Sequence, residues 1–311
     1  MARAVDMAPL ITVITPTHNR RETVLRAVES VLSQSMPRFE HIVVDDGSTD
    51  GTAAALARIS DPRLVYVGAK WRGANAARNA GIERARAPVV TFLDSDDVYL
   101  PHRLERTLAW FDDNAALQVL LSSFVSRKGS RSTNCVNPET FVSPMLLERT
   151  LVAQTIFIAG SAISARREAL LEIGGYDSDI NRMQDRELLL RLARRFGAQL
   201  SGDMDWTKYN SQNSISGRRA GYVEAYANLM GKHPHIAHSY PHIPPYMIAR
   251  QIIADILRGR IPEAFEGYMA NRSSKALGYS LPELVSGYVQ GRRWRRDLSN
   301  KFRDERGARP A

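Results

Sequence analysis

Residues 89 to 97 read VVTFLDSDD, and this short segment indicates both the architecture and the site of the chain. Five apolar or β-branched residues run directly into three acids, as expected for a buried strand that ends in a polar turn. Two earlier segments repeat the pattern. LITVIT (Leu10 to Thr15) leads into Pro16-Thr17-His18, and Glu40 to Val44 leads into Asp45-Asp46. The sequence therefore predicts three buried strands that each end in polar side chains.

Helical patterns separate these strands. Asn19 can cap the first helix, with Glu22 in the capping-box position, and a run of small residues from Ala74 to Arg86 predicts another helix. Alternation of strands and helices at this spacing predicts an α/β fold, with a parallel sheet covered by helices on both faces. Ligands bind beyond the carboxyl ends of the strands in such sheets. We therefore expect the polar groups at the three strand ends to meet at one rim.

The second half of the chain is less regular. Thr155 to Ser164 is consistent with a further strand, and Asp185 to Phe196 is amphipathic with helical periodicity. Beyond Gly217 the pattern is mostly helical, with proline-rich breaks. We predict two domains: an α/β domain over residues 1–216, and a helical C-terminal region with a basic tail over residues 217–311.

The composition is that of a globular protein with excess positive charge. The formal net charge is +9, and eight basic against three acidic residues fall between Gly291 and Ala311. Such a segment can attract phosphates, anionic lipid or nucleic acid, or it can be a solvated tail that identifies no partner. No apolar run reaches the roughly 18 residues that span a membrane, and the first residues lack the apolar core of a secretory signal. The single cysteine, Cys135, fits a reducing compartment, so we expect a cytoplasmic protein.

The acidic turn Asp94-Ser95-Asp96-Asp97 predicts a cation site. Its three carboxylates repel one another, so a bound divalent ion or a basic partner would stabilise them. Oxygen-only ligands suit Mg²⁺ or Mn²⁺, which commonly bridge the phosphates of a substrate. The alternative is that the turn caps the helix beginning near Pro101, because Asp is a good N-cap residue, and Asp97 could serve only that purpose.

Several motifs in series resemble those of family 2 glycosyltransferases. They are ITPTHNR (residues 14–20), VVDDGSTDGT (43–52), ARNAGI (77–82) and FLDSDD (92–97), in matching order and spacing. GGYD (174–177) and QDRELLLRL (184–192) extend the resemblance to about residue 215. The resemblance implies a GT-A fold, which is a Rossmann-like nucleotide-diphospho-sugar transferase fold, in residues 1–216. It also implies an inverting enzyme of the hexosyltransferase type.

The resemblance also implies roles for individual residues. Asp94-Ser95-Asp96 resembles the DxD motif, with Asp94 towards the ribose of the donor and Asp96 on a divalent metal, Mn²⁺ or Mg²⁺. Asp185 corresponds to the catalytic base. Asp46 would contact the nucleobase, and Arg78 a phosphate or a nearby acid. The full set implied to bind the nucleotide sugar is Pro16, Thr17, His18, Asn19, Asp46, Arg78, Asn79, Asp94 and Ser95.

The implied chemistry is physically consistent. Negative charge develops on the phosphates of the leaving nucleoside diphosphate, and a divalent cation would neutralise it. A carboxylate can take the proton of the acceptor hydroxyl as it attacks the anomeric carbon from the side opposite the leaving group, which inverts configuration. The helical pattern alone favours another role for Asp185, as N-cap of the helix that carries Leu188 and Leu192, and one residue could do both.

Two positions depart from the family pattern. Gln184 stands where the family usually has an acid before the base. Ser211 or Gln212 stands where a histidine often precedes a run like Ser214-Ile215-Ser216. The chain therefore lacks the acid that would tune the base, and the resemblance does not imply a histidine contact to the metal or a phosphate.

Two other functions compete with the transferase. A nucleotidyltransferase that makes nucleotide sugars can share a similar core, but it would carry a glycine-rich basic loop after the first strand. Residues 16–20, PTHNR, contain no glycine. A basic, non-enzymatic nucleic-acid-binding protein would interleave aromatic and basic residues on one face. Only Trp294 and Phe302 do so in the tail, and the acidic rim argues against this function.

The tail leads to a prediction about partners. On a helix, Trp294, Leu298 and Phe302 fall at four-residue steps on one face, with arginines beside them. A narrow apolar stripe flanked by arginines is how an interfacial helix binds anionic lipid. The alternative is that the stripe packs on the protein. The resemblance implies a glycan or lipid-linked acceptor, cell-envelope or exopolysaccharide synthesis, and a peripheral location on the inner face of the cell membrane.

Overall fold

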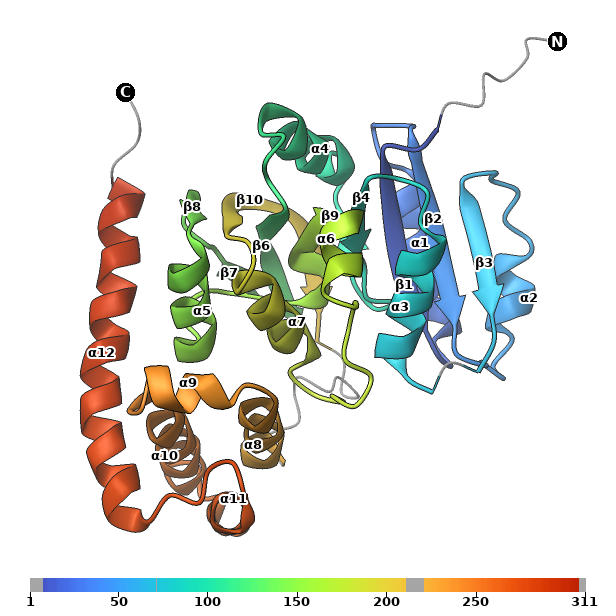
Figure 1. Cartoon of the computed structure of the whole chain (residues 1–311). Helices are drawn as coiled ribbons and strands as arrows, with labels where there is room; N and C mark the ends of the chain where they lie inside the picture. Colours follow the sequence, from blue (N-terminus) through green and yellow to red (C-terminus); the bar gives the residue numbers. More distant parts are fainter. Residues whose placement is uncertain (1–7, 71, 211–220, 308–311) are drawn as a thin grey trace, which may run out of the picture. The chain divides into compact units, whose positions relative to one another are not determined.

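The computed structural model describes residues 8–70, 72–210 and 221–307 (Figure 1). These residues divide into two compact units. Unit 1 contains residues 8–70, 72–147, 157–178 and 188–210, and unit 2 contains residues 148–156, 179–187 and 221–307. Unit 2 therefore takes two segments from the middle of the chain. The domain boundary predicted at residue 216 lies outside the described residues.

Unit 1 is built on a mixed sheet whose first half is parallel. This half consists of β1 (Ile11–Thr17), β2 (Phe39–Asp45), β3 (Leu64–Gly68) and β4 (Val89–Phe92). The four strands lie in the order β3-β2-β1-β4. β1, β2 and β4 each begin and end within two residues of their predicted bounds. The α/β core predicted from the sequence is confirmed.

Helices cover both faces of this parallel half, as the alternation of strands and helices predicts. α3 (Ala74–Arg84) packs on one face, against Val44 of β2. α1 (Arg21–Leu32) and α2 (Thr52–Leu56) pack on the other, against Val43. Successive side chains of a strand point to opposite faces, so β2 is buried on both sides.

The second half of the sheet is not parallel throughout. β9 (Ile163–Arg166) runs antiparallel between β4 and β6 (Val119–Lys128). β10 (Ala198–Tyr209) runs parallel to β6, and three short strands complete the sheet, namely β5 (Val98–Tyr99), β7 (Arg131–Cys135) and β8 (Thr140–Val142). The parallel sheet predicted from the N-terminal strands therefore accounts for β1 to β4 only, because periodicity reports that a strand is buried but not the direction of its neighbour.

The strand predicted at Thr155 to Ser164 is also wrong over most of its length. Residues Gly160–Ala162 form a short 3-10 helix, η1, and the strand begins only at Ile163. Upstream, the N–H of Phe157 donates to Oδ1 of Asn137 at 2.8 Å, and the Asn137 amide donates to the Phe157 carbonyl at 2.9 Å. A side chain therefore satisfies the backbone groups that a neighbouring strand would otherwise pair.

Unit 2 is helical, which confirms the predicted C-terminal region. Its helices are α8 (Tyr222–Lys232), α9 (Pro234–Ser239), α10 (Ile243–Ile256), α11 (Ile261–Ser273) and α12 (Leu281–Gly307). α8, α11 and α12 all pack on α10. Of the remaining helices, α4 (Arg103–Asp113) and α6 (Arg167–Glu172) belong to unit 1, whereas α5 (Pro144–Ala153) and α7 (Gln184–Ala193) contribute residues to both units. None of the helices in the described ranges is long and apolar enough to cross a membrane.

The apolar stripe predicted to bind lipid packs on the protein instead. The Trp294 ring lies 5.9 Å from the Tyr240 ring, and Leu298 is 9% exposed. Gly291 on the same face approaches α10 so closely that a Cβ there would lie 2.4 Å from Cβ of Tyr246. The side chain of Phe302 lies outside the described residues. Of the two interpretations of the stripe, packing is therefore the one observed.

His41 should make the stability of the sheet depend on pH. Its ring is fully buried on β2, with Nε2 2.9 Å from the Thr15 hydroxyl, and burial lowers the pKa of His41 to about 3. The unfolded chain takes up this proton near pH ~6.5 and the native state only near pH 3, so stability is full above pH ~6.5 and falls as the pH decreases below it. We expect His41→Gln, which cannot titrate, to remove up to about 1.4 kcal/mol of pH dependence per pH unit.

Denaturant unfolding of both proteins at neutral and mildly acidic pH measures this effect. The other histidines are common to the two proteins, so their contributions cancel in the difference. Equal slopes of unfolding free energy against pH in the two proteins would show that the pKa of His41 is not lowered in the native state.

Candidate active site at the rim of the sheet

The carboxyl ends of β1, β2 and β4 bring the predicted polar segments together. In the register of the sheet, Thr17 at the end of β1 pairs with Asp45 at the end of β2. The N–H of Asp46 donates to the Thr17 carbonyl at 2.9 Å, and the N–H of Leu93 donates to the Ile14 carbonyl at 3.0 Å. The acidic turn that begins at Asp94 therefore starts beside β1. The expectation that three strand ends meet at one rim is confirmed.

The loop after β1 is held to the loop after β2. Asn19 has a φ of +49°, and its Oδ1 accepts the N–H of Thr49 at 2.7 Å. The N–H of Asn19 donates to the Ser48 hydroxyl at 2.8 Å. Nδ1 of His18 lies 2.8 Å from the backbone carbonyl of Asp46. These contacts fix the backbone on which two implied donor-binding residues, His18 and Asn19, are mounted.

Asn19 is not the N-cap of α1. The N-cap position is Arg20, and no side chain of its own segment caps the helix. The carboxylate of Asp50 caps it from the neighbouring loop by accepting the N–H of Arg21 at 2.8 Å. The other oxygen of Asp50 accepts the N–H and hydroxyl of Thr52 at the start of α2. One acid therefore serves two helix starts, which leaves Asn19 to hold the loops together.

The adjacent acids Asp45 and Asp46 have different tasks. The buried Asp45 accepts the hydroxyl of Tyr66 at 2.9 Å, and burial together with this carboxylate raises the pKa of Tyr66 to about 12. Asp46 accepts the backbone N–H groups of Arg72 at 3.1 Å and Gly73 at 2.7 Å. Both of these residues have positive φ. Asp46 therefore shapes the loop that leads into α3, and its predicted contact with a nucleobase stays a prediction.

Arg78 on α3 stabilises the acidic turn. Its guanidinium is 3% exposed, and Nη2 donates to Oδ1 of Asp94 at 2.7 Å. Of the two roles implied for Arg78, contact with a nearby acid is the one observed. Burial would raise the pKa of Asp94, but Arg78, Lys208 and Arg20 oppose it, and the pKa is lowered overall. Asp94 is therefore a carboxylate at neutral pH.

Asp96 pairs with a cation from the loop after β1. Its Oδ2 lies 2.8 Å from Nη1 of Arg20, and its backbone carbonyl accepts Nη2 of Arg26 at 2.8 Å. Within the described ranges there is no cluster of three or more acidic, histidine or cysteine side chains arranged to hold a metal. Asp94 and Asp96 offer oxygen donors only, which fits Mg²⁺ or Mn²⁺ if phosphates and water complete the coordination.

Asp97 faces the interior and not the rim. It is fully buried, and its carboxylate accepts the Ser161 hydroxyl at 2.6 Å and the N–H of Tyr209 at 3.1 Å. Burial raises the pKa of Asp97 to about 7. The capping alternative is wrong for this residue, because the next helix, α4, begins only at Arg103.

Two residues at the rim were missed by the sequence-based reasoning. The Ser161 hydroxyl accepts the N–H of Asp94 at 3.0 Å while it donates to Asp97. The positive charge of Lys208 on β10 lowers the pKa values of Asp94 and Asp97, whereas burial raises them. Neither lies in a motif, and both come from later strands or turns, so no local signal could have found them.

The remaining implied donor-binding residues differ in how they are engaged. Both ends of the Asn79 amide bond the backbone of Tyr176, so Asn79 fixes the GGYD segment. Pro16 lies within β1, and Ser95 is buried in the turn. Thr17 is buried, and its hydroxyl has no hydrogen-bond partner among the described residues. A buried hydroxyl at a strand end is available to a ligand. Contact of these residues with a donor stays a prediction.

Asp185 belongs to unit 2. It lies in the first turn of α7, which begins one residue earlier at Gln184, so Asp185 is a first-turn residue and not the N-cap. A carboxylate there interacts favourably with the helix dipole. Asp185 also attracts the buried guanidinium of Arg186. The neighbouring departures from the family pattern, Ser211, Gln212 and residues 214–216, lie outside the described residues.

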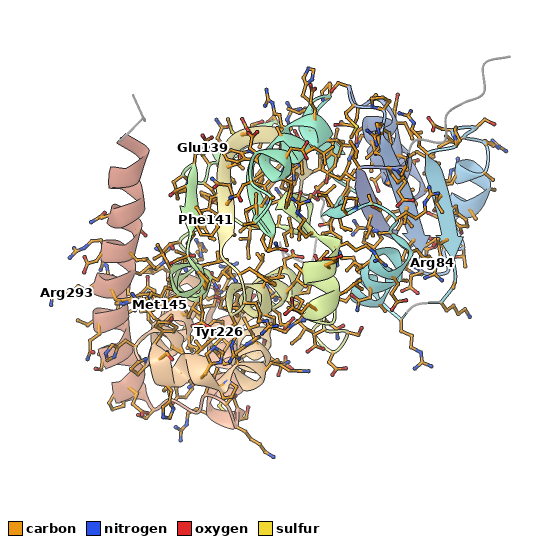
Figure 2. The ribbon with its side chains drawn as sticks, turned by 45° about the horizontal axis from the view of Figure 1, so that its top comes forward. Arg84, Glu139, Phe141, Met145, Tyr226 and Arg293 are labelled. Atoms are coloured by element: carbon orange, nitrogen blue, oxygen red, sulfur yellow. The ribbon has the colours of Figure 1, made fainter. Side chains whose placement is uncertain are left out.

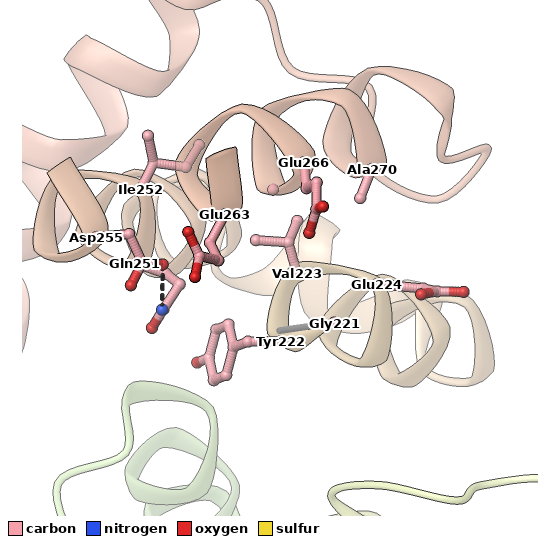
Figure 3. A pocket seen from close by; sticks show the side chains of 11 residues that line it. Gly221, Tyr222, Val223, Glu224, Gln251, Ile252, Asp255, Glu263, Glu266 and Ala270 are labelled. Carbon is pink, nitrogen blue, oxygen red and sulfur yellow. Dashed lines mark hydrogen bonds between the residues drawn. The ribbon is translucent and has the colours of Figure 1, made fainter. Parts of the chain in front are cut away.

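Unit 2 has a cavity of about 250 Å³ between α8, α10 and α11 (Figure 3). Four of its lining residues are acidic, namely Glu224, Asp255, Glu263 and Glu266. Asp255 already has internal partners, because Gln251 donates to it at 2.6 Å and Arg260 forms an ion pair with it at 2.7 Å. A lining of carboxylates repels phosphates, so this cavity does not suit a nucleoside diphosphate.

Comparison with known proteins identifies relatives of this chain. Residues 12–174 match the family model described as glycosyl transferase family 2. The chain is 42% identical over 106 residues to the succinoglycan biosynthesis protein ExoO of Rhizobium meliloti. The aligned residues cover 34% of this chain and 30% of ExoO. It is 37% identical over 150 residues to the putative teichuronic acid biosynthesis glycosyltransferase TuaG of Bacillus subtilis, covering 46% of this chain and 59% of TuaG.

A third relative carries a more specific name. The chain is 33% identical over 101 residues to WfgD of Escherichia coli, a UDP-Glc:alpha-D-GlcNAc-diphosphoundecaprenol beta-1,3-glucosyltransferase. The match covers 32% of this chain and 40% of WfgD. The chain therefore spans less than two thirds of the length of each of these three relatives.

Solved structures share the fold over nearly the whole chain. S. aureus TarS 1–349 in complex with UDP-GlcNAc has a TM-score of 0.67 at 18% identity, covering 94% of this chain and 91% of that one. The mannosyltransferase PcManGT from Pyrobaculum calidifontis, in complex with GDP-Man and Mn²⁺, has a TM-score of 0.60 at 20% identity, covering 94% and 85%. These likenesses confirm the GT-A fold with a helical C-terminal region.

Proposed function

The chain belongs to glycosyl transferase family 2, and we propose on that basis that it moves a sugar from a nucleoside diphosphate sugar to a hydroxyl of a glycan acceptor, with inversion at the anomeric carbon. One observation carries the proposal. The acidic turn at the carboxyl end of β4 holds Asp94 and Asp96 against three cations, Arg20, Arg78 and Lys208. Neither a nucleotidyltransferase nor a nucleic-acid-binding protein is favoured by this arrangement.

The rim would bind the donor through both charge and hydrogen bonds. Asp94 would accept a ribose hydroxyl, because Arg78 already keeps this carboxylate ionised and oriented. The unpartnered Thr17 hydroxyl and the His18 ring, both at the end of β1, would contact the nucleoside. The positive charges of Arg20 and Lys208 would attract the two phosphates of the donor. Asp96 and the phosphates of the donor would hold a divalent ion, Mn²⁺ or Mg²⁺, which neutralises charge on the leaving diphosphate.

Asp185 would take the proton of the acceptor hydroxyl. A carboxylate within reach of the hydroxyl suffices for this step, and the reaction needs no covalent intermediate. The printed names of the relatives guide the choice of acceptor. WfgD acts on a diphosphoundecaprenol-linked sugar, and ExoO and TuaG are named for polysaccharide synthesis. We infer a lipid-linked glycan acceptor in cell-envelope or exopolysaccharide synthesis, reached at the inner face of the cell membrane.

Donor binding tests the proposal directly. We expect UDP, GDP or dTDP to raise the melting temperature of the full chain, and the effect to grow when Mn²⁺ is added. A ligand that binds only the native state at 100 times its Kd stabilises it by about 2.7 kcal/mol, which a thermal-shift measurement resolves easily. Slow release of free sugar from the matching nucleotide sugar should accompany binding. If none of the three nucleotides shifts the melting temperature with or without Mn²⁺, the proposed donor site is refuted.

A further inference from the structure

Exposed apolar side chains are concentrated in unit 2. Among the described residues, fourteen large apolar side chains are strongly exposed, and eight of them lie between Ile256 and Val289. They come from the end of α10, the following turn, α11 and the first half of α12. Scattered exposed apolar residues need no explanation, but a concentration of this kind marks an interaction surface.

The outer flank of α12 carries three of these residues in a row. Leu281, Val285 and Val289 are 59–65% exposed and follow one another at four-residue steps. A helix turns by about 100° per residue. Arg292 and Arg296 therefore lie on the same side of α12 as the three apolar residues, within an arc of about 80° around the helix axis. Glu283 and Asp297, the acids of α12 as far as Asn300, fall outside this arc. Arg293, next to the stripe, projects outward from α12 (Figure 2).

α11 repeats the arrangement. Ile261, Phe265 and Met269 are 48–63% exposed at four-residue steps, and Arg272 continues the same stripe three residues later. The acids of this helix, Glu263 and Glu266, line the cavity between α8, α10 and α11 and therefore lie on another face. Two neighbours of α10 therefore present the same sequence of groups, first three apolar side chains and then arginine.

The exposed stripe of α12 is distinct from the face that packs on the protein. The packed face contains Gly287 and Gly291, which approach Pro245 and Tyr246 closely. Trp294 and Leu298 continue that face. The helix therefore has one apolar face that unit 2 covers and a second apolar flank that remains exposed.

We propose that the outer flank of α12 docks onto an anionic lipid bilayer, with Leu281, Val285 and Val289 entering the interface and the arginines beside them binding lipid phosphates. An apolar stripe beside basic residues, with the acids on another face, is the pattern of helices that lie in the plane of a membrane. The inference deepens the proposed function, since a lipid-linked acceptor would be met at that bilayer. It does not depend on Asp96 or Asp185.

Charge favours a bilayer over a second copy of the chain. Between Gly291 and Asn300, α12 carries Arg292, Arg293, Arg295 and Arg296 against the single acid Asp297. A symmetric dimer through this flank would bring the same positive charge to both sides of the contact, whereas anionic lipid supplies the opposite charge. Attraction of basic side chains to such lipid is screened by salt.

Point substitutions in the full chain test the proposal better than truncation. Removing α12 after Ser286 would also remove Trp294 and Leu298, which pack on unit 2, and the shortened protein could fail to fold. We choose Val285→Gln with Val289→Gln for the apolar part, and Arg292→Gln with Arg296→Gln for the charged part. All four side chains are exposed, so the substitutions should leave the fold unchanged.

Sedimentation with vesicles gives the readout. We expect the wild-type chain at low salt to sediment with vesicles of phosphatidylcholine and phosphatidylglycerol, and much less with phosphatidylcholine alone. Each double variant should lower the partition coefficient by at least about tenfold. Matched controls from unit 1, Leu171→Gln and Arg131→Gln, replace exposed side chains of the same kinds and should bind like wild type.

Three outcomes would overturn the proposal. They are a wild-type chain that stays in the supernatant at low salt, double variants that bind like wild type, and light scattering that shows a dimer lost in the Val285/Val289 variant. The last outcome would assign the surface to a second copy. Nucleotide binding is measured on the same samples, so failure of the donor site and failure of the lipid surface are seen separately.

Discussion

Replacing Asp185 by Asn should lower turnover by ~10²-fold or more while donor affinity stays nearly unchanged. Asn keeps the shape of the side chain but cannot accept the proton of the attacking hydroxyl. The donor groups proposed here belong to unit 1, and Asp185 belongs to unit 2, so nucleotide binding should not respond to the change. Transfer rates at saturating donor and acceptor, together with nucleotide affinity by calorimetry, measure both quantities.

A structural effect of this substitution is small and separable. Loss of a charge from the first turn of α7 costs about 0.3–1 kcal/mol of helix-dipole interaction. This loss would lower the melting temperature slightly, but it would not lower turnover a hundredfold. Asp179→Asn is the matched control, because it alters an exposed acid of the same unit, whose ion pair with Lys232 lies at the surface. If Asp185→Asn retained turnover near that of wild type, another group would be the base.

Asp96→Ala should abolish the Mn²⁺-dependent part of nucleotide affinity. In the wild-type protein we expect Mn²⁺ to tighten nucleotide binding, because the ion links the phosphates to the Asp96 carboxylate. In the variant, nucleotide affinity in the presence of Mn²⁺ should equal nucleotide affinity in its absence. Sugar transfer should be lost together with the metal effect. Nucleotide titrations with and without Mn²⁺ measure the difference in one experiment.

The fold should survive this substitution. Asp96 pairs with Arg20 near the surface, whereas the contacts that hold the turn come from Asp97, Ser161 and Arg78. Asp112→Ala, an exposed acid near the end of α4, controls for the loss of one surface carboxylate. Undiminished enhancement by Mn²⁺ in Asp96→Ala, with an unaltered melting temperature, would remove Asp96 as the metal ligand.

The parallel half of the sheet and its rim could be predicted because they depend on local patterns. A strand buried on both faces is rich in apolar and β-branched residues, as β1 and β4 are throughout and β2 is from Ile42 to Val44. The polar residues that follow each run reach the same rim because the strands are parallel. Family motifs then named the residues at those ends. No such motif led to Ser161 or Lys208.

Within the acidic turn, the sequence could not distinguish the three carboxylates. Asp94, Asp96 and Asp97 are chemically alike, yet Asp94 pairs with Arg78, Asp96 with Arg20, and Asp97 is buried against Ser161. Each partner comes from a different part of the chain. The pKa values therefore diverge, lowered for Asp94 and raised to about 7 for Asp97, only because the folded chain places different groups beside each acid.

The sequence by itself predicted a helical C-terminal region with a basic tail, and helical spacing placed Trp294 and Leu298 on one face. In α12 the same spacing also aligns a second apolar stripe, Leu281 with Val285 and Val289. Only the tertiary structure decided that α10 and Tyr240 cover the first and leave the second exposed. Periodicity shows which side chains share a face, but burial depends on which neighbour the rest of the chain brings against that face.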